Sequence, residues 1–314
     1  MCLERMPEPS AYHAPVLAGA VVDLLGGCRS VLDCTLGGGG HAITLLEAGV
    51  SRVVGVDRDP EALSTAADRL RPYADAGRFE AIESNYAAVD EVPELSGATF
   101  DGILLDLGVS SHQVDAESRG FTFRPGAPLD MRMGPDASGT AADFLNEESE
   151  RSLTDAFRLY ADEPRAARLA REITRRRANR RFDSSDDLVG AIRAVLGPKS
   201  GAPDFARIFQ AVRIAINDEL SGLERALPVL RDRLAAGGTM VVIAYHSGED
   251  RLVKHAFREW SAACICPPRQ PVCTCRGRPL GTTLTRRALA ASVDEVALNP
   301  RARSARLRAW RSAE

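Results

Sequence analysis

The sequence has no long hydrophobic run. No segment approaches the roughly 18 uninterrupted apolar residues that indicate a membrane-spanning helix. The first residues, Met-Cys-Leu-Glu-Arg-Met, also lack the positive flank and the apolar stretch of a secretory signal. We therefore expect no membrane partner and predict a cytoplasmic location.

Lysine is nearly missing. Of the 40 residues that are Lys or Arg, only Lys199 and Lys254 are lysines, so the preference for arginine extends over the whole chain. The net charge of −3 also argues against a uniformly basic surface. Arginines do crowd into residues 165–181 and 301–311. These runs predict either solvated, ion-paired helix faces or patches that neutralise phosphates.

Internal repeats and low-complexity tails are missing as well, which excludes repeat arrays. What is present is an ordinary globular composition, with 45% hydrophobic and 26% charged residues. A chain of 314 residues exceeds the usual size of a single core. We expect either two domains or one large domain that carries an insertion.

Short apolar segments alternate with helical ones in the first part of the chain. We predict strands over 30–36, 52–57, 78–83 and 100–107, and helices over 40–48 and 59–70. This alternation is typical of parallel βαβ units, so the predicted fold class is α/β. A further strand over 239–245 follows helical sequence at 208–236, which we expect to be broken or kinked at Pro228 and ended by Gly237-Gly238.

Residues 115–210 have a different character. They begin with a loop rich in glycine and proline and continue as helical sequence rich in Arg and Glu. The segment is too long for a loop, so we predict a mainly helical inserted domain over 115–210. The α/β domain is then discontinuous, comprising 1–114 and 211–314. The insertion follows the carboxyl end of a strand, where α/β folds build their sites.

A glycine run, Asp33-Cys-Thr-Leu-Gly-Gly-Gly-Gly-His41, follows the first predicted strand, and Asp57 ends the next one. Glycine lets the backbone approach a ligand, and a carboxylate at this place hydrogen-bonds the hydroxyls of a ribose. Gly37, Gly39 and Ala42 also fit the dinucleotide pattern. A nicotinamide or flavin enzyme therefore stays open, as does a tight turn without a ligand.

Further motifs follow in order over nearly the whole chain. They are His13-Ala-Pro-Val-Leu17, Val56-Asp-Arg-Asp-Pro60, Asp101-Gly-Ile-Leu-Leu-Asp-Leu-Gly-Val-Ser-Ser111 with Gln113, Arg119-Gly-Phe-Thr-Phe123, Pro128-Leu-Asp-Met-Arg-Met133, Phe209-Gln-Ala-Val-Arg-Ile214, Tyr245-His-Ser-Gly-Glu-Asp-Arg251 and Asn299-Pro-Arg-Ala-Arg-Ser304. With the glycine run, they resemble the bacterial 16S ribosomal RNA (cytosine-N4) methyltransferase family, also called MraW or RsmH. Two positions depart from it: Gly248 stands where Leu is common, and Tyr245 where Phe is frequent.

The resemblance implies a class I S-adenosylmethionine-dependent methyltransferase fold, which is Rossmann-like, with an inserted helical domain. It also implies N4-methylation of a cytosine by direct in-line transfer to the exocyclic amine. The implied partner is 16S rRNA within the small ribosomal subunit. A non-catalytic ribosome-assembly factor with the same fold is the alternative, and the oligomeric state, including a homodimer, stays open.

Carried over residue by residue, the resemblance implies seven residues around S-adenosylmethionine. They are Gly39, Gly40, His41, Asp57, Tyr86, Asp106 and Gln113. The residue types agree with that role, since Asp57 suits the ribose diol and Tyr86 can lie against the adenine. Each also has a structural alternative: Tyr86 as a core aromatic, Asp106 as a helix cap and Gln113 as a surface residue.

Methyl transfer mainly requires alignment of the amine with an activated donor. Because the amine lone pair is delocalised into the cytosine ring, acceptors for the amine hydrogens would help. The Asp/Asn/Ser-Pro-Pro-aromatic signature of amino-methyltransferases is missing, and Asp106-Leu-Gly-Val-Ser-Ser111 stands in its place. The catalytic candidates are therefore Asp106, Ser110 or Ser111, and His246, whose alternative is a hydrogen-bonded histidine at a strand end. The target base must be extruded or single-stranded.

Four of the seven cysteines are clustered. Cys264-x-Cys266 and Cys273-x-Cys275 form two tight pairs separated by a proline-rich stretch. Four thiolates can hold one tetrahedral zinc ion, although zinc knuckles more often use Cys-x-x-Cys. Structural zinc is therefore one prediction, and free or redox-sensitive thiols are the other; disulfides are disfavoured in the cytosol.

Overall fold

The structure is a computed structural model that describes residues 15–267, 269–270 and 272–314, without the side chains of residues 111 and 112. His13, which opens the first motif, lies outside the described residues. The chain forms two compact units. The first comprises Met1–Gly108 and Glu224–Glu314, and the second comprises Val109–Leu223. The second unit begins before and ends after the range of 115–210 predicted for the insertion.

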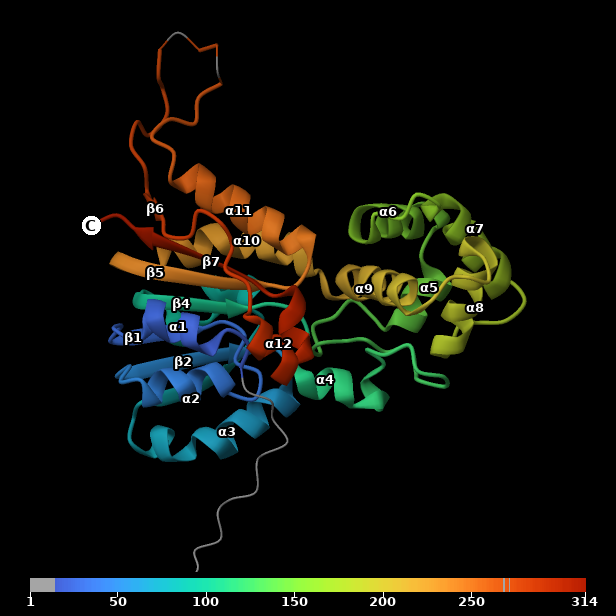
Figure 1. Cartoon of the computed structure of the whole chain (residues 1–314), viewed down its shortest axis with the longest axis horizontal. Coiled ribbons are helices and arrows are strands. Elements are labelled where there is room, and N and C mark those ends of the chain that lie inside the picture. Colours follow the sequence, from blue (N-terminus) through green and yellow to red (C-terminus); the bar gives the residue numbers. More distant parts are fainter. Residues whose placement is uncertain (1–14, 268, 271) are drawn as a thin grey trace, which may run out of the picture. The chain divides into compact units, whose positions relative to one another are not determined.

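The first unit is built on a seven-stranded sheet with the order β3-β2-β1-β4-β5-β7-β6 (Figure 1). Its strands are β1 (Ser30–Asp33), β2 (Arg52–Asp57), β3 (Phe79–Glu83), β4 (Phe100–Asp106), β5 (Leu234–Ala244), β6 (Gly281–Thr283) and β7 (Arg306–Ser312). The first five strands run parallel, whereas β7 is antiparallel to both β5 and β6. This order and this antiparallel strand are those of class I methyltransferases, as the resemblance implied.

Both faces of the sheet are buried. Alternate strand residues face opposite sides, and one set joins α1, α2 and α3 in a hydrophobic core that includes Val31, Val53, Leu104, Val241 and Ile243. The intervening residues lie on the other face, where α11 packs. There the ring centroid of Trp310 lies 5.2 Å from that of Trp260. The flanking helices are α1 (Ala18–Leu25), α2 (Gly40–Glu47), α3 (Pro60–Asp75), α10 (Glu219–Asp232), α11 (Ser247–Trp260) and α12 (Val293–Leu298), with the 3-10 turns η1 (Tyr86–Glu91), η2 (Pro93–Leu95) and η4 (Pro300–Ser304).

The glycine pair at 237–238 does not end a helix as predicted. It lies inside β5, where the register with β4 shifts between Phe100 and Gly102. Gly237 has a φ of 72°, and a Cβ on Gly238 would lie 2.9 Å from the Ala235 carbonyl oxygen. The glycines therefore form an irregularity in the strand, a known alternative use of glycine in sheets.

The second unit is helical. Its helices are α4 (Ser111–Asp115), α5 (Ala141–Glu147), α6 (Glu150–Ala161), α7 (Ala166–Arg177), α8 (Ser185–Leu196) and α9 (Ala202–Asn217), with the 3-10 turn η3 (Glu117–Arg119). They enclose a core of their own around Phe157, Ile173, Ile192 and Val212. No helix in the described part of the chain is both long and apolar enough to cross a membrane.

The helical sequence does not break at Pro228, where a break or a kink was predicted. Pro228 lies within α10, and the helical sequence is interrupted earlier, at Asp218. Asp218 has a φ of 51°, which ends α9 in the left-handed region that short polar residues tolerate. The turn chemistry of Asp218 therefore outweighs the proline as the point of interruption.

Candidate functional site

Three aspartates end neighbouring parallel strands. Asp33 is the last residue of β1, Asp57 of β2 and Asp106 of β4, and the order β2-β1-β4 makes these strands adjacent. The carboxyl ends of parallel strands meet at one edge of the sheet, and ligands of open α/β folds bind there. The three carboxylates therefore define a candidate site in the first unit.

The glycine turn closes one side of this edge. Gly37 and Gly39 have φ values of 52° and 77°, which favour glycine. A Cβ on Gly39 would lie 2.6 Å from the Leu70 Cδ1 atom, so the turn packs tightly against α3. The Gly37 N–H donates to the Asp57 carboxylate at 2.7 Å. That bond ties the turn to the end of β2.

Asp57 accepts a second backbone bond, from the Asp59 N–H at 2.9 Å. Burial raises the pKa of this carboxyl above its ordinary value, and the backbone N–H groups of Asp59, Gly37 and Arg58 offset part of that effect. A carboxylate offers about four acceptor sites, so three backbone donors leave capacity for a further donor such as a ribose hydroxyl. Asp57 thus braces the turn, and its binding to a ribose stays a prediction.

Asp106 is contacted by two side chains from other elements. The Tyr245 hydroxyl, directly after β5, donates to the Asp106 Oδ1 atom at 2.8 Å. The His41 Nε2 atom, in the first turn of α2, lies 3.4 Å from Oδ2. Burial and the charge of Asp106 both raise the pKa of Tyr245, so the phenol stays protonated and remains a donor. The two contacts fix the orientation of the carboxylate plane.

His41 is almost fully buried and does not cap the helix that it opens. Burial alone would lower its pKa, but the Asp106 carboxylate beside it and the charge of Asp33 outweigh that effect and raise it. Among the described residues, neither ring nitrogen has a partner at hydrogen-bond geometry, although Nε2 approaches Asp106 at 3.4 Å. Its position in the first turn of α2, beside Asp106, agrees with packing at the ligand edge.

Asp33 is 1% exposed and only half satisfied. Its Oδ1 atom accepts from the Thr35 N–H at 3.2 Å, whereas no described residue donates to Oδ2. Burial raises the pKa of this carboxyl to about 7, although His41 and the Thr35 N–H act in the other direction. A buried acceptor without a donor is uncommon, so the Oδ2 atom has hydrogen-bonding capacity left for a further donor.

Tyr86 follows the same edge of the sheet. It begins η1, just past the carboxyl end of β3, and its side chain is half-buried. The Asn85 side chain accepts from the Ala87 N–H at 2.9 Å and so caps this turn. The structure therefore brings Tyr86 to the strand end next to that of Asp57, since β3 pairs with β2.

Ser110 and Gln113 lie in the second unit, where they bond each other. The Ser110 N–H donates to the Gln113 Oε1 atom at 3.0 Å, and the Gln113 N–H donates to the Ser110 Oγ atom at 3.2 Å. This reciprocal pair is a capping box for α4. A surface position is the alternative that the sequence left open for Gln113, but Gln113 is buried.

His246 caps α11. Its Nδ1 atom accepts from the N–H groups of Gly248 and Glu249, and its Nε2 atom lies 3.3 Å from the Glu249 carboxylate. The Glu249 carboxylate in turn accepts from the Tyr245 N–H at 2.8 Å. The cap thus fixes the backbone at the end of β5, where Tyr245 reaches Asp106.

The arginines of 165–181 are largely paired. Arg175 and Arg176 bond Glu172, and Arg181 bonds Glu147. These hydrogen bonds lower the pKa of Glu172 to about 2. Of the two interpretations left open by the sequence, the ion-paired helix face is the one that these contacts support.

Sequence reasoning missed two partners in this site. It treats Asp33 only as part of the glycine motif, and Tyr245 only as a departure from the family. Asp57 was identified as a site residue because it is an acidic residue at the end of a predicted strand. The same signal could have identified Asp33, which ends β1. Tyr245 has no such signal, since its bond to Asp106 joins residues 139 positions apart.

The four clustered cysteines are brought together. Their sulfur atoms all lie within 4.8 Å of one another, in the connection between α11 and β6. They come from residues distant in sequence from the glycine turn, and they belong to a different part of the first unit.

The sequence matches the MraW methylase family over residues 10–313. It is 66% identical over 302 residues to "Ribosomal RNA small subunit methyltransferase H" of Gemmatimonas aurantiaca, covering 96% of each chain. It is 44% identical to the protein of the same name from Heliobacterium modesticaldum, covering 95% of this chain and 97% of that one. A solved rRNA methylase from Streptococcus thermophilus aligns over 95% of this chain and 94% of that one, with 12% identity and a TM-score of 0.40. The fold assignment rests on the sheet order and not on this last likeness.

Proposed function

The chain belongs to the MraW methylase family, and from this we propose that it transfers a methyl group from S-adenosylmethionine to N4 of a cytosine in 16S rRNA of the small ribosomal subunit. The names of its relatives support the RNA substrate. The structural observation that carries the proposal is the edge formed by the glycine turn and the carboxylates of Asp33, Asp57 and Asp106.

The donor set fits S-adenosylmethionine, which carries an ammonium group, a sulfonium and a ribose diol. Three carboxylates at one edge suit a cationic ligand, and the unpartnered Asp33 Oδ2 atom suits the ammonium group. Asp57 would bind the ribose, Tyr86 the adenine, and the backbone at Gly39 and Gly40 the adjoining part of the ligand. Gln113 stays a prediction for the same ligand. A nicotinamide dinucleotide carries two phosphates, which three nearby carboxylates would disfavour.

When bound, S-adenosylmethionine supplies a methyl group that the sulfonium has already activated for in-line transfer. The chain must then orient the acceptor amine. We propose Asp106 for this role, because Tyr245 and His41 hold its carboxylate while lone pairs remain for the amine hydrogens. The amine proton would leave to water after the transfer. Ser110 and His246 remain predictions for contacts to the target base, and the caps they form fix their orientation.

RNA contact requires an exposed cationic surface. Residues 261–292 contain five arginines and no Asp or Glu, and Arg269, Arg278, Arg286 and Arg287 are exposed. This acid-free segment, residues 261–292, is a better phosphate-binding surface than the paired arginines of α7. A ribosomal substrate also agrees with the cytoplasmic location expected from the sequence.

The proposal is tested by mapping methylated cytosines in 16S rRNA from cells with and without this protein, by mass spectrometry of nuclease fragments. One N4-methylcytosine should disappear in the deletion strain. Purified small subunits from that strain should regain it when incubated with the protein and labelled S-adenosylmethionine. If the subunits bind the protein but gain no label, it is an assembly factor. If the protein binds NADH and no methyl donor, it is a nicotinamide enzyme.

A further inference from the structure

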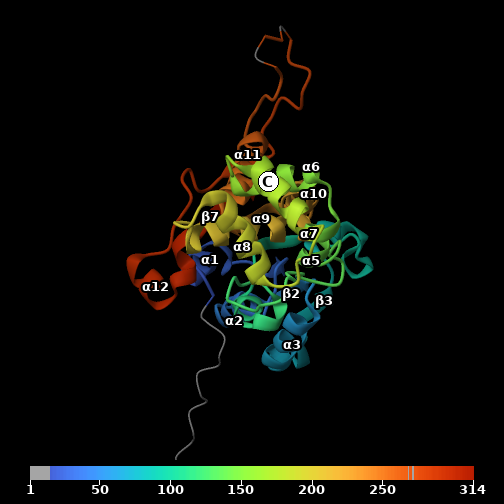
Figure 2. The same ribbon diagram turned by 90° about the vertical axis from the view of Figure 1, so that its right-hand side faces the viewer.

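The connection between α11 and β6, residues 261–280, has no evident source of stability of its own. Its described residues form only turns and bends, and it extends away from the helices of the first unit in both views (Figures 1 and 2). Its apolar side chains are not packed: Ile265 is 46% and Val272 is 70% exposed. A connection this long without regular structure is uncommon in a compact domain and needs another constraint.

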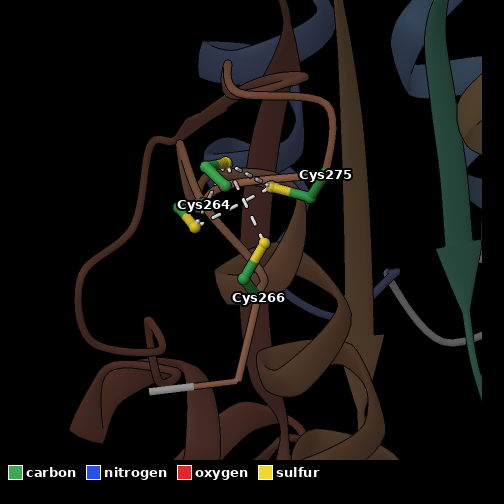
Figure 3. A group of neighbouring side chains, drawn as sticks. Cys264, Cys266 and Cys275 are labelled. Carbon is green, nitrogen blue, oxygen red and sulfur yellow. Dashed lines mark hydrogen bonds between the residues drawn. The ribbon is translucent and has the colours of Figure 1, made fainter. Parts of the chain in front are cut away.

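The side chains that do converge in this connection are sulfurs. Figure 3 shows the side chains of Cys264, Cys266 and Cys275 directed toward a common centre. The Cys273 sulfur lies 3.8 Å from that of Cys264, 3.9 Å from that of Cys266 and 3.5 Å from that of Cys275. The sulfurs of Cys264 and Cys275 are 3.8 Å apart.

These separations are those of ligands that share one ion. A zinc–sulfur bond is about 2.3 Å long, so two thiolates on a tetrahedral zinc ion lie about 3.8 Å apart. A disulfide would require about 2.05 Å, and all four cysteines are free thiols in the structure. Two disulfides would also draw the sulfurs into separate pairs, whereas here Cys273 approaches each of the other three.

The backbone around the sulfurs is arranged to stabilise thiolates. The Ile265 N–H donates to the Cys275 sulfur at 3.4 Å, and the Gly277 N–H donates to the same sulfur. The N–H groups of Thr274 and Cys275 donate to the Cys266 sulfur. Gly277 has a φ of 66°, which lets the chain turn back toward Cys275. Donors of this kind orient ligands around a metal ion.

The surrounding charge also suits an anionic cluster. Residues 261–280 include Arg269, Arg276 and Arg278 and no acidic side chain. Arg276 is fixed at the base of the connection, where it donates to the carbonyl oxygens of Glu259 and Ala262. Four thiolates around one divalent ion carry a net charge of −2, which nearby guanidinium groups stabilise.

We propose that Cys264, Cys266, Cys273 and Cys275 bind one Zn²⁺ ion that holds the α11–β6 connection in its folded form. Each thiol loses its proton to solvent on binding, and nothing is oxidised or reduced. Four protein ligands leave no open coordination position, so the site is structural and does not take part in methyl transfer. The zinc proposal does not rest on the proposed methyl transfer, although the four cysteines lie within the acid-free segment, residues 261–292, that is proposed to contact RNA.

The direct test is the metal content of the purified full-length chain, prepared under reducing conditions without chelators and measured by inductively coupled plasma mass spectrometry. We expect one zinc ion per chain. Cys264→Ser should remove most of it, whereas Cys264→His should keep it, because an imidazole nitrogen can replace one thiolate in such a site. Cys28→Ser, which changes a cysteine outside the cluster, is the control and should keep the ion.

A second measurement keeps the proposal testable where a variant folds poorly. The wild-type chain, stripped of metal and titrated with Co²⁺, should develop the visible absorption of a tetrahedral thiolate site at one equivalent, and added Zn²⁺ should abolish it. Alkylation of all four cysteines by iodoacetamide in the presence of excess Zn²⁺ would overturn the proposal. The proposal would also be overturned if peptide mass mapping found two disulfides among the four cysteines in protein isolated from cells with a reducing cytosol.

Discussion

Asp106 is held by two neighbours of different chemistry. The neutral Tyr245 hydroxyl donates to one oxygen, and the His41 ring lies against the other. An acceptor fixed in this way needs no reorganisation when a substrate amine arrives, and preorganisation of this kind is the larger part of electrostatic catalysis. In the proposed reaction Tyr245 would be a positioning residue, and a Phe at this position would leave the Asp106 carboxylate without its hydroxyl donor.

We expect Asp106→Asn to lower turnover by about 100-fold at saturating S-adenosylmethionine, the magnitude seen when one preorganised hydrogen-bonding group is removed. The amide offers one acceptor oxygen in place of two and adds a donor that faces the amine. The measurement is single-turnover methylation of small subunits from the deletion strain. Asp57→Ala should instead weaken binding of S-adenosylmethionine, measured by calorimetry, and keep most turnover at saturation. Equal turnover of Asp106→Asn and wild type would remove Asp106 from the mechanism.

A pH dependence follows from Asp33. Burial raises the pKa of its carboxyl to about 7 in the folded chain, well above the ordinary value for an aspartate. The folded state then holds the proton more tightly than the unfolded state does. The contribution to stability is fully present below about pH 4 and is lost as the pH rises toward 7. The raised pKa of His41 acts with the same sign at higher pH, because protonation is again favoured in the folded state.

Asp33→Asn should therefore flatten the decline of stability between about pH 4 and pH 7. The measurement is the urea midpoint of unfolding for wild type and variant at several pH values without ligand. The Asp33 charge also helps to raise the pKa of His41, whose ordinary value is 6.5. The difference between the two curves below about pH 6 therefore reports mainly on Asp33. Parallel curves for the two proteins would contradict the raised pKa.

The backbone of the glycine turn lies close to α3 at Gly39 and leaves no space for a side chain. A Cβ on Gly39 would lie 2.6 Å from Leu70 Cδ1, and the φ of 77° disfavours any side chain. We expect Gly39→Ala to destabilise the chain by roughly 1–2 kcal/mol from the left-handed backbone alone, with a further destabilisation from displacing Leu70. Affinity for S-adenosylmethionine should fall as well, because the turn must shift.

Gly77→Ala is the matched control. Gly77 has a φ of 68°, and a Cβ there would meet nothing within 4 Å. It should show the backbone effect alone, without loss of ligand affinity. Urea unfolding and calorimetry of both variants separate the two contributions. If the two variants are destabilised equally, the packing against Leu70 has no role in holding the turn.

The parallel strands were predictable because they are buried on both faces and read as continuous apolar runs. β2 matches the predicted range of 52–57. β3 begins one residue later than the predicted range of 78–83, and β4 ends one residue before the end of the predicted range of 100–107. β6 and β7 were not predicted. β6 has only three residues, and β7 alternates Arg with apolar residues, a pattern obscured by the arginine-rich sequence around it. The helix end predicted from Gly237-Gly238 lies instead inside β5, and the helical sequence is interrupted at Asp218 and not at Pro228.

Site residues could be predicted from the sequence where they lie at the ends of predicted strands. Asp57 and Asp106 could be identified because each ends an apolar run. The contacts among His41, Asp106 and Tyr245 could not, because they join three elements that only the folded sheet brings together. The cysteine cluster could be predicted in part. The spacing of the cysteines suggested metal ligands, but only the sulfur positions in the structure show that the two pairs converge.

Charged residues are distributed unevenly along the chain, although the net charge is only −3. The arginines of α7 are paired with nearby Glu residues, whereas the acid-free segment, residues 261–292, has none in its own sequence. Exposed cations without acidic neighbours attract phosphates over a Debye length, and paired ones do so weakly. The two arginine-rich regions should therefore differ in their effect on RNA binding.

We expect the double variant Arg286→Ala/Arg287→Ala to bind 16S rRNA fragments about tenfold more weakly at physiological salt, and to lower the slope of log K against log salt by about 0.7 for each phosphate that is no longer neutralised. Arg171→Ala/Arg175→Ala removes the same charge from α7 and should change both quantities little, because Glu150 and Glu172 already neutralise these arginines. Filter binding over a salt series measures both. A larger effect of the α7 pair would reverse the assignment, because it would mean that RNA displaces those ion pairs and that the acid-free segment faces solvent during catalysis.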